Sequence, residues 1–201
     1  MFSDEKLFTL NGGLNKQNDR VRAVSREEAN KLGGLKTLQK YPMSIVVWCG
    51  LTQYGPILYF LNKGERIDGK YYTRKILPLA KKKGNEMFGS RNWVFKQDGA
   101  SCHTSNLAQN WCKNNFKHFI PKDKWPPNSP DLNPLDYYFW DAVVTRMNSL
   151  DQIATTREEF QNEIIKANMS VPRYQIIKAL NAFHGRVRRV ENSKGGRANN
   201  K

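Results

Sequence analysis

The chain has 201 residues, of which 39% are hydrophobic and 11% aromatic; this is enough for one domain with a packed core, and it excludes a disordered chain. Lys and Arg number 33 against 18 Asp and Glu, and the net charge of +15 favours a polyanionic partner such as nucleic acid without identifying a fold. The three cysteines form no CxxC pair and are odd in number, which argues against a disulfide framework. With only three histidines as well, a zinc site is not expected. No apolar run approaches the roughly 18 residues that a membrane span needs.

Strand patterns dominate the first third of the chain. The run MSIVVWCGLT is nearly continuous, apolar and β-branched, as expected of a buried strand, and Gly55-Pro56 predicts a turn into its hairpin partner. Between the first two strands, residues 11–42 are polar and basic, which indicates a long loop with about one helical turn. The expected strands, in chain order, are residues 2–10, 43–52, 57–62, 92–98 and 118–121.

Helical patterns follow the hairpin. A helix over residues 68–83 fits the apolar spacing there, with Pro78 kinking it or ending it early. The next helix begins at Thr104 or Ser105, and it carries Leu107 and Trp111 on one face. Further helices are expected at about 134–148, 155–168 and 171–190.

This order of elements predicts an α/β fold, in which a mixed sheet is flanked by helices. We expect a single domain over residues 1–190. The basic tail, residues 191–201, is expected to be disordered.

Three acids stand out, and each has a structural explanation as well as a chemical one. In PPNSPDLNPLDYYFW, Asn133 and Pro134 fit a helix N-cap and first position, which sets Asp136 beside the positive pole of the helix, where a capping box alone explains it. Asp98 ends a strand, at the sheet edge where ligands bind in open α/β folds, but QDG is also a common turn. Asp4 lies inside a strand, where aspartate is unfavourable unless it faces water or has a function.

Together the three acids suggest a site for divalent ions. If they converge, their oxygens suit Mg²⁺, which keeps further positions for water and phosphate oxygens. Two such ions about 4 Å apart are a known arrangement for phosphodiester cleavage. The basic charge of the chain would attract the nucleic acid that supplies those phosphates.

Four segments resemble the catalytic domain of mariner-type transposases, which belong to the DDE/DDD superfamily of DNA-cutting enzymes and have a ribonuclease-H-like fold. FSDEKLF resembles the strand of the first acid, and YPMSIVVWCGLTQYGPILYFL resembles the tryptophan-glycine hairpin. VFKQDGASCHTS resembles the second-acid motif and WPPNSPDLNPLDYYFW the third, and this pair is highly specific. The resemblance covers essentially the whole chain.

The resemblance implies that Asp4, Asp98 and Asp136 are the catalytic residues and hold two Mg²⁺ or Mn²⁺ ions. The spacings between them fall in the family's range, the second in its longer-spaced branches. Asp131 is the alternative third ligand, but that position in the motif usually carries a structural acid, so Asp136 is favoured. The implied function is cut-and-paste transposition, in which the protein cleaves DNA at transposon ends and joins the 3′ hydroxyl to target DNA.

The chain departs from the family pattern in two respects. The family carries roughly a hundred further N-terminal residues, two helix-turn-helix modules that these 201 residues lack, so we expect this chain to bind DNA mainly through charge. After the second acid the family usually has asparagine and, two residues later, proline. Here these are Gly99 and Ser101, and the glycine loosens the turn and removes an amide that could orient the neighbouring acid.

The main alternative is a truncated or domesticated relic that binds DNA or a partner without cutting it. Another alternative is a structure-specific nuclease of the same fold, although SPDLNP favours the transposase branch. By the resemblance, residues 11–42 are expected to contribute to a homodimer on DNA. We expect a soluble intracellular protein located in the nucleus, because its substrate is DNA and its clusters are basic.

Overall fold

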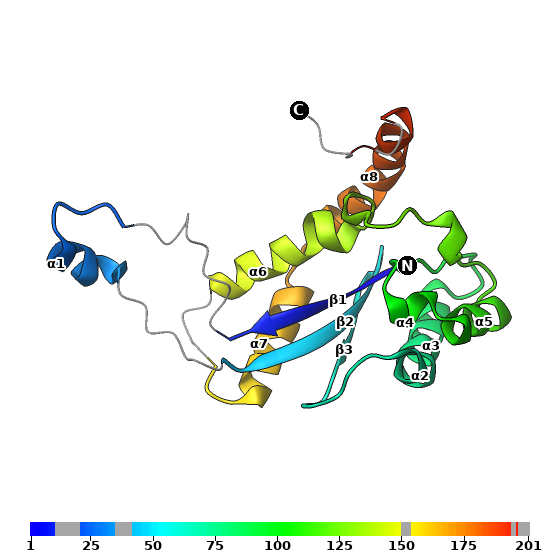
Figure 1. Ribbon diagram of the computed structural model, residues 1–201, viewed down its shortest axis with the longest axis horizontal. Helices are drawn as coiled ribbons and strands as arrows, with labels where there is room; N and C mark the ends of the chain where they lie inside the picture. Colours follow the sequence, from blue (N-terminus) through cyan, green and yellow to red (C-terminus); the bar gives the residue numbers. More distant parts are fainter. Residues whose placement is uncertain (11–20, 35–41, 150–153, 194–195, 197–201) are drawn as a thin grey trace.

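The computed structural model describes residues 1–10, 21–34, 42–149, 154–193 and 196 (Figure 1). The strands are β1 (Phe2–Thr9), β2 (Ser44–Thr52) and β3 (Gly55–Phe60). The α-helices are α1 (Arg26–Ala29), α2 (Gly69–Tyr71), α3 (Leu77–Phe88), α4 (Ser101–Thr104), α5 (Asn106–Asn115), α6 (Trp140–Asn148), α7 (Arg157–Met169) and α8 (Arg173–Asn192). Shorter helical turns are η1 (Asn30–Gly34), η2 (Tyr72–Ile76), η3 (Lys122–Lys124), η4 (Pro130–Leu132) and η5 (Leu135–Phe139).

The strands form an antiparallel sheet in the order β1-β2-β3, and β2 lies in the middle. The turn between β2 and β3 lies at residues 53–54, two residues earlier than the sequence suggested, and Gly55 begins β3 with a φ of +125° that favours glycine. Pro56 is tolerated within β3 because, in the described part of the sheet, that strand lies at the edge.

Among the described residues, the sheet continues beyond β1 only through isolated parallel bridges. Phe2 pairs with Lys96, and Phe95 pairs with Phe119. The strands expected at 92–98 and 118–121 are therefore reduced to single pairing points. One reason is that the first segment turns away at Asp98, whose carboxylate accepts a hydrogen bond from the Ala100 N–H at 3.0 Å.

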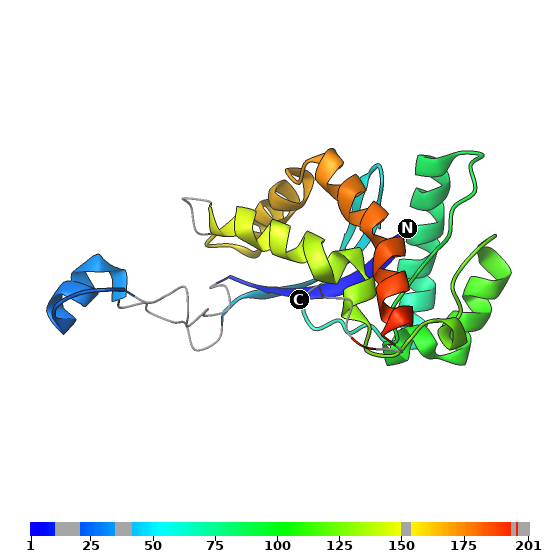
Figure 2. The ribbon, with the colours of Figure 1, turned by 90° about the horizontal axis from the view of Figure 1, so that it is seen from above.

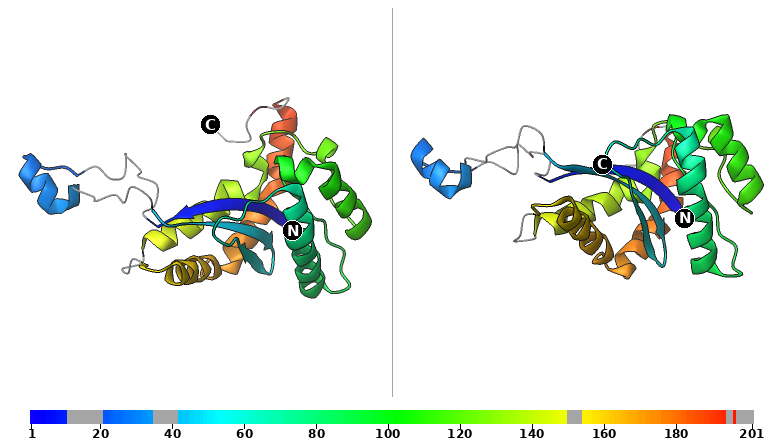
Figure 3. Two further views of the ribbon diagram at one scale, coloured as in Figure 1. Left: turned by 60° about the horizontal axis from the view of Figure 1, so that its bottom comes forward. Right: turned by 90° about the horizontal axis from the view of Figure 1, so that it is seen from below.

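Helices cover both faces of the sheet, as Figures 2 and 3 show. Alternate β2 side chains, such as Val47 and Leu51, pack against α6, α7 and α8. Trp48 points the other way, into a second cluster with η2, α3 and α5. The α/β fold with helices flanking the sheet is confirmed, and the Asp4 strand lies between the two helical layers.

Two details of the helices differ from the sequence expectation. The helix continues from Gly69 to Phe88 and is not ended by Pro78. The wide η2 turn ends just before this proline, where the Leu77 N–H donates to the Tyr72 carbonyl, so Pro78 stands in the first turn of α3, where a proline is tolerated. In α5 the buried side chains are those of Ala108 and Cys112, while Leu107 is 49% exposed. The apolar face of α5 is thus one position away from the one expected.

The segment after β1 contains the expected helical turn, α1 with η1, capped by the Ser25 hydroxyl at 3.2 Å from the Glu28 N–H. The rest of the loop prediction, at 11–20 and 35–41, lies outside the described residues, as does most of the predicted tail after Ser193. Among the described helices, none combines the length and apolar character needed to cross a membrane.

Candidate active site

Backbone pairing brings Asp4 and Asp98 together. The Lys96 N–H donates to the Met1 carbonyl and the Ser3 N–H to the Lys96 carbonyl, both at 2.9 Å. The two segments are parallel, so residues 96–98, which end at Asp98, lie beside residues 2–4 of β1, which end at Asp4. The expected convergence of the first two acids therefore follows from one short stretch of parallel pairing.

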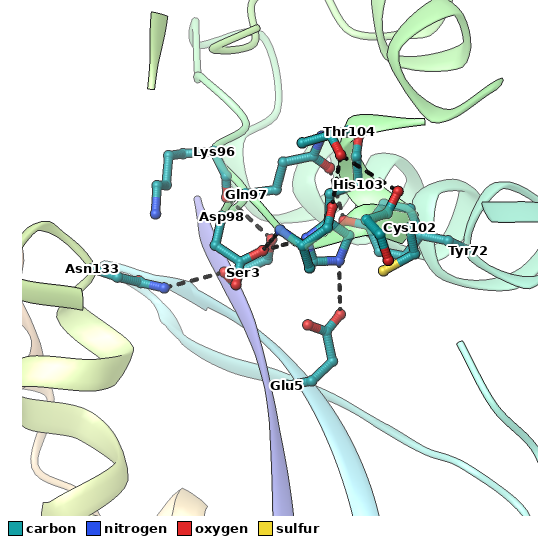
Figure 4. Close-up of polar contacts among 12 residues, drawn as sticks. Ser3, Glu5, Tyr72, Lys96, Gln97, Asp98, Cys102, His103, Thr104 and Asn133 are labelled. Atoms are coloured by element: carbon teal, nitrogen blue, oxygen red, sulfur yellow. Dashed lines mark hydrogen bonds and ion pairs between the residues drawn. The ribbon is translucent and has the colours of Figure 1, made fainter. Parts of the chain in front are cut away.

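The proline-rich segment sets Asp136 against the same part of β1. Asn133 is the N-cap: its side-chain oxygen accepts from the Leu135 N–H at 3.3 Å, and its amide donates to the Ser3 carbonyl at 3.4 Å. The amide thereby joins the helix start to β1 beside Asp4, as Figure 4 shows for Asn133 and Ser3. Pro134 is the first helical residue after Asn133, as the sequence predicts.

Helix α8 braces this helix start from outside. The Tyr137 hydroxyl donates to the Ala179 carbonyl at 2.7 Å, and the Arg186 guanidinium lies 3.9 Å from the centre of the Tyr137 ring. Arg186 also donates to the backbone carbonyl of Asp131 at 3.1 Å. These contacts attach the turn that carries Asp136 to α8 on both sides of that residue. Arg186 therefore has a packing role in this part of the fold.

Asp4 is the most perturbed of the three acids. It is 8% exposed, and its Oδ2 accepts from the Trp140 indole N–H at 2.6 Å. Burial raises the pKa of Asp4 to about 7, and the charges of Asp136, Glu5 and Asp98 add to the effect, while the Trp140 hydrogen bond opposes it. Asp4 is thus a carboxylate that a nearby cation would stabilise in its ionised form.

Asp98 is held by a buried histidine. The fully buried His103 ring donates from Nδ1 to Asp98 Oδ1 at 2.5 Å and from Nε2 to Glu5 Oε1 at 3.1 Å (Figure 4). Burial alone would lower the pKa of His103, but Tyr72 against its ring and the two carboxylates hold that pKa well above its usual value. Although burial acts to raise it, the pKa of Asp98 lies below its usual value because of His103 and the Ala100 N–H.

The third acid shares this electrostatic environment. Asp136 reaches the surface, yet desolvation raises the pKa of its carboxylate, the Lys96 charge opposes this, and the Asp98 charge adds to it. Burial lowers the pKa of the Lys96 ammonium to about 8, against the attraction of Asp98, Asp136 and Asp4. The three carboxylates and one lysine therefore sense one another's charge, as a shared site requires.

These residues fit a divalent cation by chemistry. Carboxylate oxygens are the ligands that Mg²⁺ and Mn²⁺ prefer. The pKa values of Asp4 and Asp136 are raised mainly by burial, and neighbouring acids add to this, so a bound cation would favour the ionised form of both carboxylates. Within the part of the chain that the structure describes, no three Asp, Glu, His or Cys side chains are gathered tightly enough to form a ready metal site.

Sequence reasoning missed several residues around the acids. Glu5, Trp140 and Lys96 contact or face the three acids, and none was singled out from the sequence. Trp140 lies four residues after Asp136, on the same side of the helix, and Lys96 lies two residues before Asp98, on the same side of an extended segment. A lysine within the largely apolar strand pattern WVFKQD is unusual, and this could have indicated a residue with a role at the site.

Replacing His103 by leucine is expected to lower the free energy of unfolding by about 2–4 kcal/mol, because Asp98 and Glu5 lose their shared donor. Urea unfolding monitored by tryptophan fluorescence measures this. His118→Leu, at an exposed histidine, is the matched control and should change stability by less than about 0.5 kcal/mol. Equal effects of the two substitutions would show that the buried bridge contributes nothing.

No protein-family model matches this chain. Curated relatives do: the chain is 26% identical to the Transposable element Tcb1 transposase of Caenorhabditis briggsae, over 97% of this chain and 68% of the relative. It is 25% identical to the Transposable element Tc3 transposase of Caenorhabditis elegans, over 99% of this chain and 57% of the relative. The chain thus spans between about half and two thirds of the length of these relatives.

Solved structures share the fold. The Mos1 transposase paired-end complex with left transposon end matches with a TM-score of 0.74 at 15% identity, over 98% of this chain and 56% of that one. The catalytic domain of Mos1 mariner transposase matches with a TM-score of 0.65 at 16% identity, over 96% of this chain and 81% of that one. The match therefore extends over nearly all of the chain, and it is to a catalytic domain.

Proposed function

We propose that this chain, a mariner-type transposase catalytic domain by its relatives and its fold, cleaves DNA phosphodiesters at transposon ends and joins the freed 3′ hydroxyl to target DNA. The observation that supports the proposal is the pairing around β1: the Phe2–Lys96 bridge lays the segment of Asp98 beside the strand of Asp4, and the Asn133 amide joins the start of the Asp136 helix to Ser3 of that strand. The chain's +15 charge supports DNA as the partner.

Asp4, Asp98 and Asp136 would hold Mg²⁺ or Mn²⁺, and Mos1 structures with each of these ions have the same fold. When bound, two such ions supply the Lewis acidity that phosphodiester cleavage needs. The chain's own residues set the ligands in place. His103 fixes one oxygen of Asp98, and Trp140 fixes one oxygen of Asp4.

The rigid proline segment would position Asp136, as His103 and Trp140 position the other two acids. Asn133 joins the start of its helix to β1, so that the third carboxylate is carried toward the other two. This supports Asp136 rather than Asp131 as the third ligand, because it is Asp136 whose charge raises the pKa of Asp4. Catalytic sites tolerate only small misplacement of their ligands.

A joining assay tests this function. A short DNA duplex with a free 3′ hydroxyl is incubated with plasmid, Mn²⁺ and the chain, and joined product is measured on a denaturing gel. Joining that disappears with a chelator and in the Asp98→Asn variant is expected. Joining that persists in either condition would contradict the proposed role of the three acids.

Gly99→Asn is expected to increase cleavage several-fold, because an asparagine beside Asp98 would add an amide that can orient the carboxylate. A side chain fits there, since a Cβ built on Gly99 meets no atom within 4 Å. Gly99→Ala, which adds the Cβ but no amide, is the control. An equal rate for the two variants would show that the amide has no role.

Two further features of the proposal follow from the substrate. A nuclear location accords with DNA as substrate. A homodimer through residues 11–42 is the second feature, since in the transposases that the chain resembles this segment helps to join two subunits on DNA.

A further inference from the structure

Lys96 is a buried lysine whose ammonium has no hydrogen-bond acceptor. The residue is 2% exposed, and its Nζ has no partner among the described atoms. The Nζ lies 3.6 Å from the centre of the Trp125 ring and 5.9 Å from that of Phe2. Phe183 packs against both rings, with centroids at 6.3 and 5.0 Å respectively.

These aromatic rings come from β1, the proline-rich loop and α8, so three separate parts of the fold enclose the ammonium. A buried ammonium is costly without a compensating acceptor, and the faces of aromatic rings offset only part of that cost. Its attraction to the aspartates is the remaining compensation that the structure offers. Lys96 is therefore placed for charge rather than for packing alone.

The backbone explains why this charge is felt at the proposed site. Lys96 pairs with Phe2, two residues before Asp4, and it lies two residues before Asp98 on the parallel segment. In Figure 4 the Lys96 side chain extends from the same segment as Asp98, and its nitrogen lies toward the side where Asn133 begins the Asp136 helix. Because Lys96 shares a side of this paired region with Asp98 and with Phe2, its charge acts on that of all three carboxylates.

We propose, as an extension of the metal site above, that Lys96 is a built-in counter-ion that weakens divalent-ion binding in the absence of DNA. When all three carboxylates are ionised, as metal ligands must be, they and the Lys96 ammonium together carry two negative charges, which a single divalent ion neutralises. His103 and Glu5 carry opposite charges and cancel. A second ion then depends on the negative charge that a DNA phosphate brings, so that the complete two-ion site forms on DNA rather than in free protein.

The test is Mn²⁺ titration of the metal-free chain at neutral pH, by calorimetry and by the electron paramagnetic resonance signal of free Mn²⁺. Lys96→Met keeps an unbranched side chain against Trp125 and removes the charge. We expect it to bind Mn²⁺ roughly tenfold more tightly than the parent without DNA. We also expect added duplex DNA to raise Mn²⁺ affinity less in the variant than in the parent. Lys82→Met, at an exposed lysine of α3, should match the parent.

Each outcome bears on a different claim. Parent and Lys96→Met proteins with the same Mn²⁺ affinity, both folded by thermal melting, would overturn the role of Lys96 and leave the metal site intact. A parent that binds no Mn²⁺ with or without DNA would overturn the metal site itself, and this inference with it. Lys96→Gln is the second neutral variant should Lys96→Met melt at a much lower temperature, and it is held to the same comparison.

Discussion

Replacing Asp136 by asparagine is expected to lower metal-dependent DNA cleavage at least about a hundredfold, while Asp131→Asn is expected to lower it less than about threefold. Loss of a residue that merely orients a metal ligand costs 10- to 100-fold, and loss of a ligand should exceed that. The measurement is the initial rate of cleavage of a labelled duplex in Mn²⁺.

The pair is well matched, because both acids belong to the same proline-rich motif and both substitutions remove one charge without changing size. The Arg186 guanidinium donates to the backbone carbonyl of residue 131, and this hydrogen bond remains possible in Asp131→Asn. Thermal melting of both variants checks that the fold survives. A larger loss of rate from Asp131→Asn would reverse the assignment of the third ligand.

Replacing Asp4 by asparagine is expected to stabilise the metal-free protein above neutral pH while it abolishes cleavage. The pKa of Asp4 is about 7 in the folded chain, against 3.8 for an aspartate without such surroundings. Between these values the folded chain retains a proton that the unfolded chain has released, so the free energy of unfolding falls as pH rises. The penalty is complete above the folded pKa and amounts to on the order of 4 kcal/mol.

Urea unfolding in the presence of a chelator, at about pH 5 and about pH 8, measures this effect. The difference in stability between Asp4→Asn and the parent should grow by a few kcal/mol from the lower to the higher pH. Asp123→Asn, at a side chain that is 67% exposed, should show no such growth. If the Asp4→Asn difference stays constant between the two pH values, burial and neighbouring charge do not act on Asp4 as described.

Much of the fold follows from local patterns. The β2–β3 hairpin and the helices α6 to α8 lie where β-branched runs and apolar spacing indicate, because these segments bury one side chain after another at regular intervals. The segments around Phe95 and Phe119 agree less well with the strands predicted from the sequence. Their pairing is limited to single bridges, and strand propensity cannot report how many residues of a segment find a partner.

The candidate site divides in the same way. The acids and the Asn133 cap can be found from motif and position in an element, since capping and strand ends are local features. The contacts of His103 with Glu5, of Trp140 with Asp4, and of Lys96 with its aromatic neighbours join residues that lie far apart in the chain. Side-chain partners of this kind depend on packing between elements, which a single sequence does not reveal.

The most direct test of the account is nicking of supercoiled plasmid in Mg²⁺ or Mn²⁺ by the chain and by its Asp98→Asn and Asp136→Asn variants. The account predicts relaxed, nicked plasmid from the parent in the presence of either ion, none with a chelator, and none from either variant. Nicking that continues in both variants would place the chemistry elsewhere. DNA binding without nicking by the parent, at any concentration of either ion, would contradict the account and identify a non-catalytic relic that keeps the fold.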